Sequence, residues 1–407
     1  MRTISIFLCL IVSYCISAQT SVNELDRKID SIYKTSKIAG FGVSIMTPDQ
    51  ILYQNGFGYA DLETNKKYTV NTIQNIGSVS KTFIGIALMK AIEQGKLTVD
   101  TPINDVLPFE INHPRYPQIP ITVEHLATHT SSILDTDAYE KSYVIENAVV
   151  LNKESYTKKE RKELELMSSN KTYSLESFLK NHLTPEGEWY EKSNFLKHQP
   201  GDRYEYSNIA SALLAYIIEI ATDMSFPEYT QKHILDPLGM NNSGWSDESI
   251  YQGHRASTYT ESGNIIPKYK LITYPDGGFK SSIKELSMYL QGLMRGYYGE
   301  DNILKATAFQ KMMSAKLTKE QYNTKKELND NYGYFWEVSP SGKMGHNGSD
   351  PGILTLMYFN KKEKVGAIFF MNTSLEESKE IIRSVQQIWN TVKEFKKDYI
   401  NTLSIGE

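Results

Sequence analysis

The stretch Ile76-Gly77-Ser78-Val79-Ser80-Lys81-Thr82-Phe83 is the most informative part of this chain of 407 residues. It places a serine three residues before a lysine at the start of an apolar segment, Ser78 to Gln94, which is predicted to be a helix ending at Gly95. Residues three apart share a helix face, so the Ser78 hydroxyl and the Lys81 amine are expected to be neighbours. Such an amine can take up the hydroxyl proton and make the serine a nucleophile.

This spacing does not by itself identify a catalytic serine. The same pattern, a serine followed three residues later by a lysine, also begins at Ser31, Ser155, Ser168, Ser177 and Ser281. A serine in the first turn of a helix is also a common cap for unpaired backbone N–H groups. The interpretation of Ser78 as a nucleophile therefore depends on what the rest of the chain supplies.

The composition is that of an ordinary globular protein, with 40% hydrophobic and 23% charged residues. The net charge is −4, so no excess of basic residues points to nucleic acid as a partner. The oligomeric state cannot be inferred from the sequence.

The first 18 residues have the pattern of a secretory signal peptide. Arg2 gives a positive start, residues 4–12 are mainly apolar, and Ile16-Ser17-Ala18 is compatible with a cleavage site. Both cysteines lie in this segment, so the mature chain is expected to have no disulfide and no thiol chemistry. An uncleaved membrane anchor is the alternative, and Tyr14 before Cys15 disfavours a lipoprotein signal. We predict a secreted or periplasmic protein without a membrane span after cleavage.

Predicted strands stand near both ends of the chain. Ala39–Met46 and Ile51–Tyr59 form a predicted hairpin across a polar turn, and Gly352–Phe359 with Lys364–Met371 form a second one. The clearest predicted helices are residues 21–37, Ile209–Thr222 and Leu375–Glu394. We therefore predict an α+β fold, in which one antiparallel sheet is built from N-terminal and C-terminal strands and is flanked by helices.

Residues 19–400 are predicted to form one domain. Its sheet-containing part consists of residues 19–95 and 270–400, and the mainly helical part between them consists of residues 96–269. Residues 139–196 are the least regular stretch, and their charged run Lys158 to Glu163 is expected to be a solvated helix face.

Two further motifs could bring side chains to Ser78. Tyr206-Ser207-Asn208 follows a Pro-Gly turn at the start of a predicted helix, and could project a phenol and an amide into a cleft. Gly345 to Gly352 contains three glycines directly before a predicted strand, so its backbone could approach a ligand closely. The alternatives are a core tyrosine, an asparagine cap and a surface histidine in a turn, and Lys343-Met344-Gly345 is a competing cationic triplet.

In this order and context, the three motifs resemble those of the serine β-lactamase-related superfamily. That superfamily includes class C β-lactamases, D-Ala-D-Ala carboxypeptidases and related esterases and D-aminopeptidases. Further stretches that resemble family blocks are Tyr59 to Thr64, Leu126 to Ser131, Pro200 to Asn208, Leu238-Gly239-Met240 and Gly277-Gly278. The resemblance extends from about residue 40 to residue 375 and implies a β-lactamase/transpeptidase-like fold.

The resemblance implies a role for each motif. Ser78 would be the nucleophile that becomes acylated, Lys81 its proton partner, and Tyr206 a base or proton shuttle. The residues implied to bind substrate are Asn208, His346, Gly348 and Ser349. The N–H groups of Ser78 and Ser349 would form the oxyanion hole, and either Lys81 or Tyr206 would be the acylation base.

The implied reaction needs no cofactor and no metal. An acyl-enzyme forms on Ser78, the first product leaves, and water hydrolyses the intermediate. The substrate would be an amide or ester, either a small molecule or a peptide such as a D-amino-acid or peptidoglycan-derived peptide.

The third motif departs from the family pattern. His346-Asn347-Gly348 stands where β-lactamases of this family carry Lys-Thr-Gly. A lysine has a fixed positive charge that can meet a substrate carboxylate, whereas histidine is neutral for much of the range near pH 7. The sequence therefore favours a peptidase or esterase over a true β-lactamase. Ser131-Ser132-Ile133 replaces the usual Ser-Gly-Leu, and residues 139–196 look longer than in compact members, so they could cover the mouth of the cleft.

Two other functions compete with this interpretation. His125 and His129 are four residues apart and could share a helix face that binds metal, but Leu126 stands where the zinc-protease pattern requires glutamate. The second alternative is a catalytically silent β-lactamase-like protein that serves binding or assembly in the cell envelope.

Overall fold

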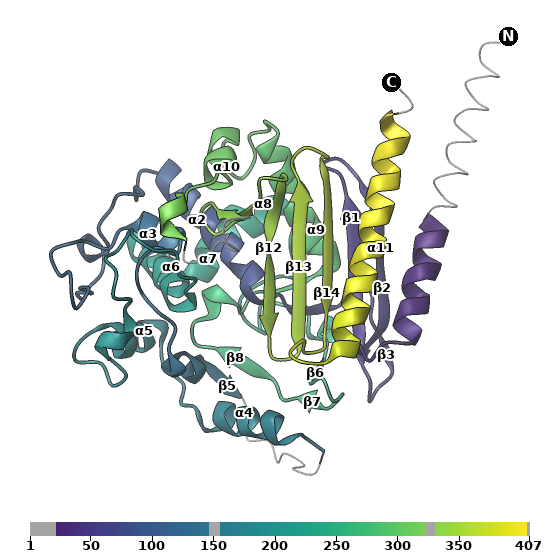
Figure 1. Cartoon of the computed structure of the whole chain (residues 1–407), viewed down its shortest axis with the longest axis horizontal. Coiled ribbons are helices and arrows are strands. Elements are labelled where there is room, and N and C mark those ends of the chain that lie inside the picture. The colour runs from purple at the N-terminus through teal and green to yellow at the C-terminus, as the bar shows by residue number, and fades with distance from the viewer. Residues whose placement is uncertain (1–21, 146–154, 323–329, 405–407) are drawn as a thin grey trace, which may run out of the picture.

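The computed structural model describes residues 22–145, 155–322 and 330–404. The predicted signal peptide, residues 1–18, lies outside the described residues, and so do residues 146–154 of the irregular stretch. The described chain consists of a large sheet with helices on both of its faces and a mainly helical part beside it (Figure 1).

One antiparallel sheet of eight strands organises the described chain, in the order β10-β11-β12-β13-β14-β1-β2-β3. Its strands are β1 Gly40–Met46, β2 Ile51–Asp61, β3 Lys66–Lys67, β10 Asn331–Tyr332, β11 Glu337–Val338, β12 Lys343–Asp350, β13 Ile353–Asn360 and β14 Val365–Met371. The N-terminal hairpin meets the C-terminal hairpin where β1 pairs with β14, with Phe41 opposite Met371. The predicted α+β fold, with one sheet built from both ends of the chain, is confirmed.

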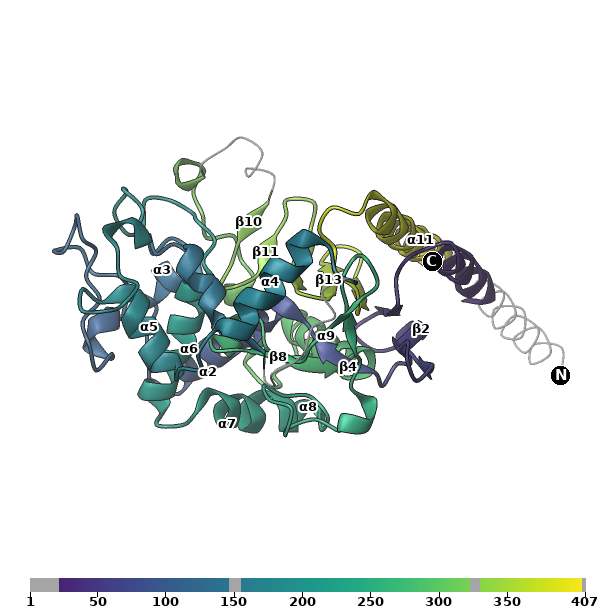
Figure 2. The same ribbon diagram turned by 90° about the horizontal axis from the view of Figure 1, so that it is seen from below.

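Helices cover both faces of this sheet. α9 Ile283–Tyr297 contacts the sheet on one face and α11 Lys379–Ser404 on the other, and α10 Ala306–Met312 packs on α9 and on α2 Lys81–Glu93. The helix of residues 22–34 lies side by side with α11 on one face, as both views show (Figures 1 and 2). β1 shows how the two faces differ: Phe41 shares an apolar cluster with Ile381 of α11, whereas a Cβ at Gly42 would lie 2.3 Å from the Ile283 side chain of α9. Alternate residues of one strand thus bury opposite faces of the sheet.

The middle of the chain is mainly helical. Its helices are α3 Val123–Ala127, α4 Lys158–Ser169, α5 Leu175–Leu183, α6 Asn208–Thr222, α7 Phe226–Thr230, the π-helical turn Gln231–Leu235 and α8 Asp236–Leu238. Its short strands are β5 Tyr143–Ile145, β6 Thr258–Tyr259, β7 Ile265–Ile266 and β8 Tyr269–Leu271. A separate pair, β4 Ile73–Asn75 with β9 Lys280–Ser282, joins the segment before Ser78 to the segment before α9.

No single described helix is long and apolar enough to cross a membrane. One pair of helices, Asn208–Thr222 with Phe226–Leu238, reaches that length and composition together, and it is bent by 79°.

The predicted helix Ser78–Gln94 begins later than expected. Gly77–Ser80 form a 3-10 turn, and the α-helix starts at Lys81. Gly77 has a φ angle of 55°, which glycine adopts without strain, and it therefore starts the turn. Ser78 is not a helix cap, because neither the turn nor the helix has a side-chain cap hydrogen bond.

The third motif and the last helix also differ from the prediction. Gly345 to Asp350 were expected to precede a strand, but they belong to β12, where His346 lies opposite Met357 of β13. Glycine, asparagine and aspartate are rare in strands, which hid this strand from the sequence pattern. The last helix begins at Lys379 rather than Leu375, because the Ser378 Oγ accepts a hydrogen bond from an N–H of its first turn.

Candidate active site

Ser78 lies on a tight turn that is held against the end of β12. Its side chain is partly exposed, whereas Gly77 beside it is buried. A Cβ at Gly348 of β12 would lie 2.7 Å from the Ser78 nitrogen and 2.3 Å from the Ile76 oxygen. Only glycine therefore lets the two backbones approach this closely. Gly348 seats β12 against the turn that carries Ser78.

Lys81 is fully buried and directs its amine at Ser78. The Lys81 Nζ lies 3.1 Å from the Ser78 Oγ, 2.6 Å from the Asn208 Oδ1 and 2.7 Å from the backbone oxygen of Asp276. An ammonium group has three N–H donors, and these three acceptors occupy all of them. The structure thus brings together the residues of the first and second motifs.

Burial lowers the pKa of the Lys81 amine below its ordinary value of 10.5, because the charged form loses its hydration. The carboxylates of Asp276, Asp135 and Asp350 oppose this shift, since negative charge stabilises the ammonium form. Burial also raises the pKa of the Asp276 carboxyl to about 7, and the positive charge of Lys81 acts in the opposite direction. The charged form of each group, the Lys81 ammonium and the Asp276 carboxylate, therefore stabilises the charged form of the other.

The sequence analysis did not single out these aspartates. The positions of two of them in the sequence could have indicated a place near the site. Asp276 directly precedes the Gly277-Gly278 block, and Asp350 lies inside the third motif.

The start of α6 places Tyr206 and Asn208. Ser207 is the N-cap of this helix, and the Asp135 carboxylate accepts hydrogen bonds from two N–H groups in its first turn, including that of Asn208 at 2.8 Å. The alternative that Asn208 is the cap is therefore wrong. Its side-chain oxygen instead accepts the hydrogen bond from Lys81.

Tyr206 is half-buried and lies between Lys81 of the first motif and His346 of the third. The Lys81 Nζ lies 5.1 Å from the centroid of the Tyr206 ring. Burial raises the pKa of the Tyr206 phenol well above 10, while a hydrogen bond with Ser78 lowers it. The phenol therefore holds its proton at neutral pH and presents an O–H group next to Ser78.

His346 is not the surface histidine of the alternative interpretation, because it is only 2% exposed. Its ring centroid lies 6.2 Å from that of Tyr206. The Nδ1 atom contacts the backbone oxygen of Asn347, which can only accept, so Nδ1 carries the proton. The Nε2 atom is then an acceptor, and it has no hydrogen-bond partner among the described residues. Burial and the charge of Lys81 lower the pKa of His346 to about 4, so the ring is neutral near pH 7.

The competing triplet around Lys343 points elsewhere. The Lys343 Nζ lies 4.5 Å from the centroid of the Tyr358 ring and 3.7 Å from a carboxylate oxygen of Glu337. Tyr358 in turn contacts Trp389 of α11, so this lysine belongs to the α11 face of the sheet.

The N–H groups of Ser78 and Ser349, which were predicted to form the oxyanion hole, both lie where the Gly77–Ser80 turn contacts β12. A Cβ at Gly77 would lie 2.9 Å from the Ser349 nitrogen, and a Cβ at Gly348 would lie 2.7 Å from the Ser78 nitrogen. The two amides thus lie where the nucleophile turn meets β12. Their catalytic role stays a prediction.

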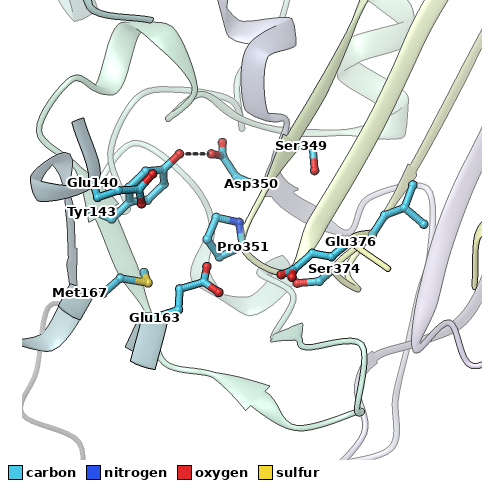
Figure 3. Close-up of a pocket in the computed structure, with 10 residues that line it drawn as sticks. Glu140, Tyr143, Glu163, Met167, Ser349, Asp350, Pro351, Ser374 and Glu376 are labelled. Carbon is cyan, nitrogen blue, oxygen red and sulfur yellow. Dashed lines mark hydrogen bonds between the residues drawn. The ribbon is translucent and has the colours of Figure 1, made fainter. Parts of the chain in front are cut away.

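A cavity of about 220 Å³ opens beside Ser349 (Figure 3). Its acidic lining residues are Glu140, Glu163, Asp350 and Glu376. Asp350 accepts a hydrogen bond of 2.6 Å from the Tyr143 hydroxyl, and burial raises the pKa of its carboxyl to about 6. Burial and neighbouring carboxylates raise the pKa of Glu163 to about 7. The wall next to the site is therefore negative or neutral, depending on pH.

The histidine pair does not have the geometry assumed for a metal site. His125 lies on α3, but α3 ends at Ala127, and His129 beyond it has a φ angle of 57°. The two rings therefore do not share a helix face. Across the described ranges, no group of three histidine, cysteine, aspartate or glutamate side chains is placed to hold a metal ion.

Known proteins resemble this chain in sequence. A family model described as Beta-lactamase matches residues 25–387. Protein flp from Staphylococcus aureus is 24% identical over 276 residues, which are 67% of this chain and 48% of that protein. The mitochondrial serine beta-lactamase-like protein LACTB from Homo sapiens is 25% identical over 298 residues, which are 63% of this chain and 54% of that protein. The chain thus spans about half the length of these curated relatives.

Solved structures share the fold. An octameric penicillin-binding protein homologue from Pyrococcus abyssi aligns with a TM-score of 0.69 and 26% identity, over 87% of this chain and 74% of that chain. A D-amino acid amidase from Ochrobactrum anthropi, complexed with L-phenylalanine amide, aligns with a TM-score of 0.65 and 19% identity, over 91% of this chain and 99% of that chain. At such low identity, the amidase shows the fold alone.

Proposed function

The chain belongs to the beta-lactamase family, and we propose that this member is a serine hydrolase that forms an acyl-enzyme on Ser78 with amide or ester substrates. The observation that carries this proposal is the 3.1 Å contact between the Lys81 Nζ and the Ser78 Oγ in a buried, carbonyl-lined position. A buried amine with a lowered pKa is a suitable base for a serine hydroxyl.

The partners of Lys81 define how the base would work. The Asn208 Oδ1 and the Asp276 backbone oxygen can only accept hydrogen bonds, so two N–H groups of the amine stay with them. When Lys81 loses its third proton, its lone pair points at Ser78, and the Ser78 O–H becomes the donor in that contact. The two carbonyl oxygens therefore aim the neutral amine at the nucleophile.

This arrangement favours Lys81 over Tyr206 as the acylation base. The Tyr206 phenol has a raised pKa and would have to lose a proton that it holds firmly at neutral pH. As a neutral O–H group beside Ser78, it is better suited to pass a proton than to remove one. We assign Lys81 the role of base and Tyr206 that of shuttle.

The proposed reaction balances in two steps. The Ser78 Oγ bonds to the substrate carbonyl carbon as its proton moves to Lys81, and the C–N or C–O bond breaks as that proton passes through Tyr206 to the leaving group. Water then attacks the ester, one of its protons returns by way of Lys81, and Ser78 is released. The N–H groups of Ser78 and Ser349 would stabilise the oxyanion in both steps.

The charge of the site points to substrates without a carboxylate near the third motif. His346 is neutral and presents an acceptor, and the cavity beside Ser349 is lined by four carboxyl groups. A carboxylate placed there would meet negative charge rather than a lysine. We therefore propose a peptidase or esterase, acting on a D-amino-acid peptide or an ester, in preference to a β-lactamase.

The site of action is proposed from the signal pattern of residues 1–18 alone. It suggests that the protein works outside the cytoplasm, where peptides derived from peptidoglycan are one available substrate class.

A fluorophosphonate probe tests the nucleophile. The wild-type protein should be labelled, Ser78→Ala should not, and Lys81→Met should label at least about a hundredfold more slowly. Methionine is preferred to alanine at position 81, because this fully buried side chain would otherwise leave a cavity. Equal labelling of wild type and Ser78→Ala would refute the assignment. No labelling of a folded wild-type protein would favour the catalytically silent alternative.

A further inference from the structure

His129 holds the backbone on both sides of Tyr206. Its carbonyl oxygen accepts a hydrogen bond of 2.8 Å from the Glu205 N–H, and its ring Nδ1 accepts one of 3.2 Å from the Ser207 N–H. One residue thus binds the N–H groups of both chain neighbours of Tyr206, Glu205 and Ser207. His129 lies in the Leu126 to Ser131 block, to which the proposed mechanism assigns no role.

The same ring also packs on the Tyr206 side chain. The two ring centroids are 4.4 Å apart with an interplanar angle of 31°, the shortest ring contact that Tyr206 makes among the described residues. Three further rings meet His129 edge-on and fix its orientation: those of Tyr204, Tyr332 and Phe335. His129 is only 1% exposed, so its ring has little room to move.

The backbone of His129 adopts a conformation that sets this geometry. Its φ angle is 57°, in the left-handed region, which only a few per cent of residues other than glycine occupy and in which asparagine, aspartate and histidine are enriched. Such a conformation costs about 1 to 3 kcal/mol and persists only where surrounding contacts enforce it. Here it lets both the carbonyl oxygen and the ring of one residue face residues 205–207.

The hydrogen bond to Ser207 also fixes the protonation state of the ring. Nδ1 accepts an N–H, so the proton of the neutral ring lies on Nε2. A second proton on Nδ1 would break this contact. Burial and the charge of Lys81 lower the pKa of His129 well below 6.5, so the ring stays neutral.

We propose that His129 is the positioning residue of Tyr206. It holds this tyrosine through the N–H groups of Glu205 and Ser207 and through the ring face, so that the phenol lies beside Ser78. This inference rests on the proposed role of Tyr206 as a proton shuttle. A histidine that only filled the core would stabilise the fold without any energetic coupling to the Tyr206 hydroxyl.

Coupling between the two side chains separates these possibilities. We would measure kcat/KM for hydrolysis of an alkyl ester, whose leaving group must take up a proton as it departs, for wild type, His129→Phe, Tyr206→Phe and the double variant. Phenylalanine keeps a ring at position 129 but removes the Nδ1 acceptor. His129→Asn is the companion variant, because asparagine tolerates the left-handed conformation and lacks the ring.

His113→Phe is the matched control. His113 is also fully buried, and its Nδ1 accepts hydrogen bonds from the N–H groups of Arg115 and Tyr116. Its described partners include no residue of the candidate site. Unfolding temperatures identify any variant that is damaged as a whole.

We expect the His129 variants to lose activity only when the Tyr206 hydroxyl is present. His129→Phe and His129→Asn should each lower kcat/KM for the alkyl ester about tenfold to a hundredfold, as misplacement of a catalytic group does. When Tyr206 is already phenylalanine, the two His129 variants should alter the rate by less than about twofold. His113→Phe should alter it by less than about twofold whether or not Tyr206 is present. Equal factors in both backgrounds, or no loss in either His129 variant, would overturn the role of His129 while leaving the nucleophile assignment standing. Loss of labelling specificity for Ser78 would instead remove the proposed function itself.

Discussion

The Lys81 Nζ donates a hydrogen bond to the Asn208 Oδ1 across 2.6 Å, and this contact ties the start of α2 to the start of α6. It joins residues 127 positions apart in the chain at the point where Ser78 is held. The amide is neutral, whereas the nearby Asp276 carboxyl is ionisable. A carboxylate in place of the Asn208 amide should therefore favour the charged form of Lys81, whereas loss of the Asp276 carboxylate should favour its neutral form.

The first prediction concerns the pH dependence of acylation. Acylation needs the neutral form of Lys81, so its rate should rise with pH through the pKa of the amine. Asn208→Asp adds a negative charge at 2.6 Å, which should raise that pKa and move the rising limb about one to two units toward higher pH. Asp276→Asn removes a charge that raises the pKa of Lys81, so the limb should move toward lower pH.

Labelling rates between pH 6 and 10 would measure both shifts. Asp61→Asn serves as the control, because this carboxylate binds Ser257 and Thr64 and is absent from the groups that shift Lys81. Shifts of the same sign in Asn208→Asp and Asp276→Asn would contradict Lys81 as the titrating base.

The second prediction concerns substrate charge. Wild-type protein should hydrolyse a neutral p-nitrophenyl ester more efficiently than nitrocefin, which carries a carboxylate. His346→Lys should raise kcat/KM for nitrocefin relative to the ester by about tenfold, because an ammonium group would then meet that carboxylate. His346→Gln, which stays neutral, is the matched control and should leave the ratio unchanged. Efficient turnover of nitrocefin by the wild-type protein would argue against the proposed preference.

Much of the fold could be predicted from local patterns. The hairpin of Ile51–Asp61 with Gly40–Met46, and that of Val365–Met371 with Ile353–Asn360, have apolar strands around polar turns, so they were readable. The β12 strand was not, because Gly345, Asn347 and Gly348 have low strand propensity. At Gly348 the close contact with Ser78, rather than the sheet, dictates the residue.

The candidate site was only partly predictable for a similar reason. Ser78, Lys81, Tyr206 and Asn208 stand in short motifs, and the structure brings their side chains together. Other contributions come from a backbone oxygen, as at Asp276, or from contacts between distant segments, as between His129 and Tyr206. Asp276 stands beside the Gly277-Gly278 block and His129 inside the Leu126 to Ser131 block, but the contacts that they make follow only from the fold. The alternative that paired the histidines at a metal failed because α3 ends before His129.

The last prediction concerns stability at the acidic cavity. Glu163 of α4 is half-buried, and burial with the charges of Glu376 and Glu140 raises the pKa of its carboxyl from 4.5 to about 7. Between these values the folded protein keeps a proton that the unfolded chain has lost, so this group makes stability fall as pH rises from 4.5 through 7. Glutamine does not ionise, so Glu163→Gln removes this fall in stability with rising pH. It should therefore be more stable than wild type by about 1 to 2 kcal/mol at pH 8, with solvent screening included, and nearly equal at pH 4.5. Urea unfolding at both pH values would measure this, with the exposed Glu165→Gln on the same helix as the control. A difference of the same size at both pH values would show that packing, rather than the ionisation of Glu163, sets the effect.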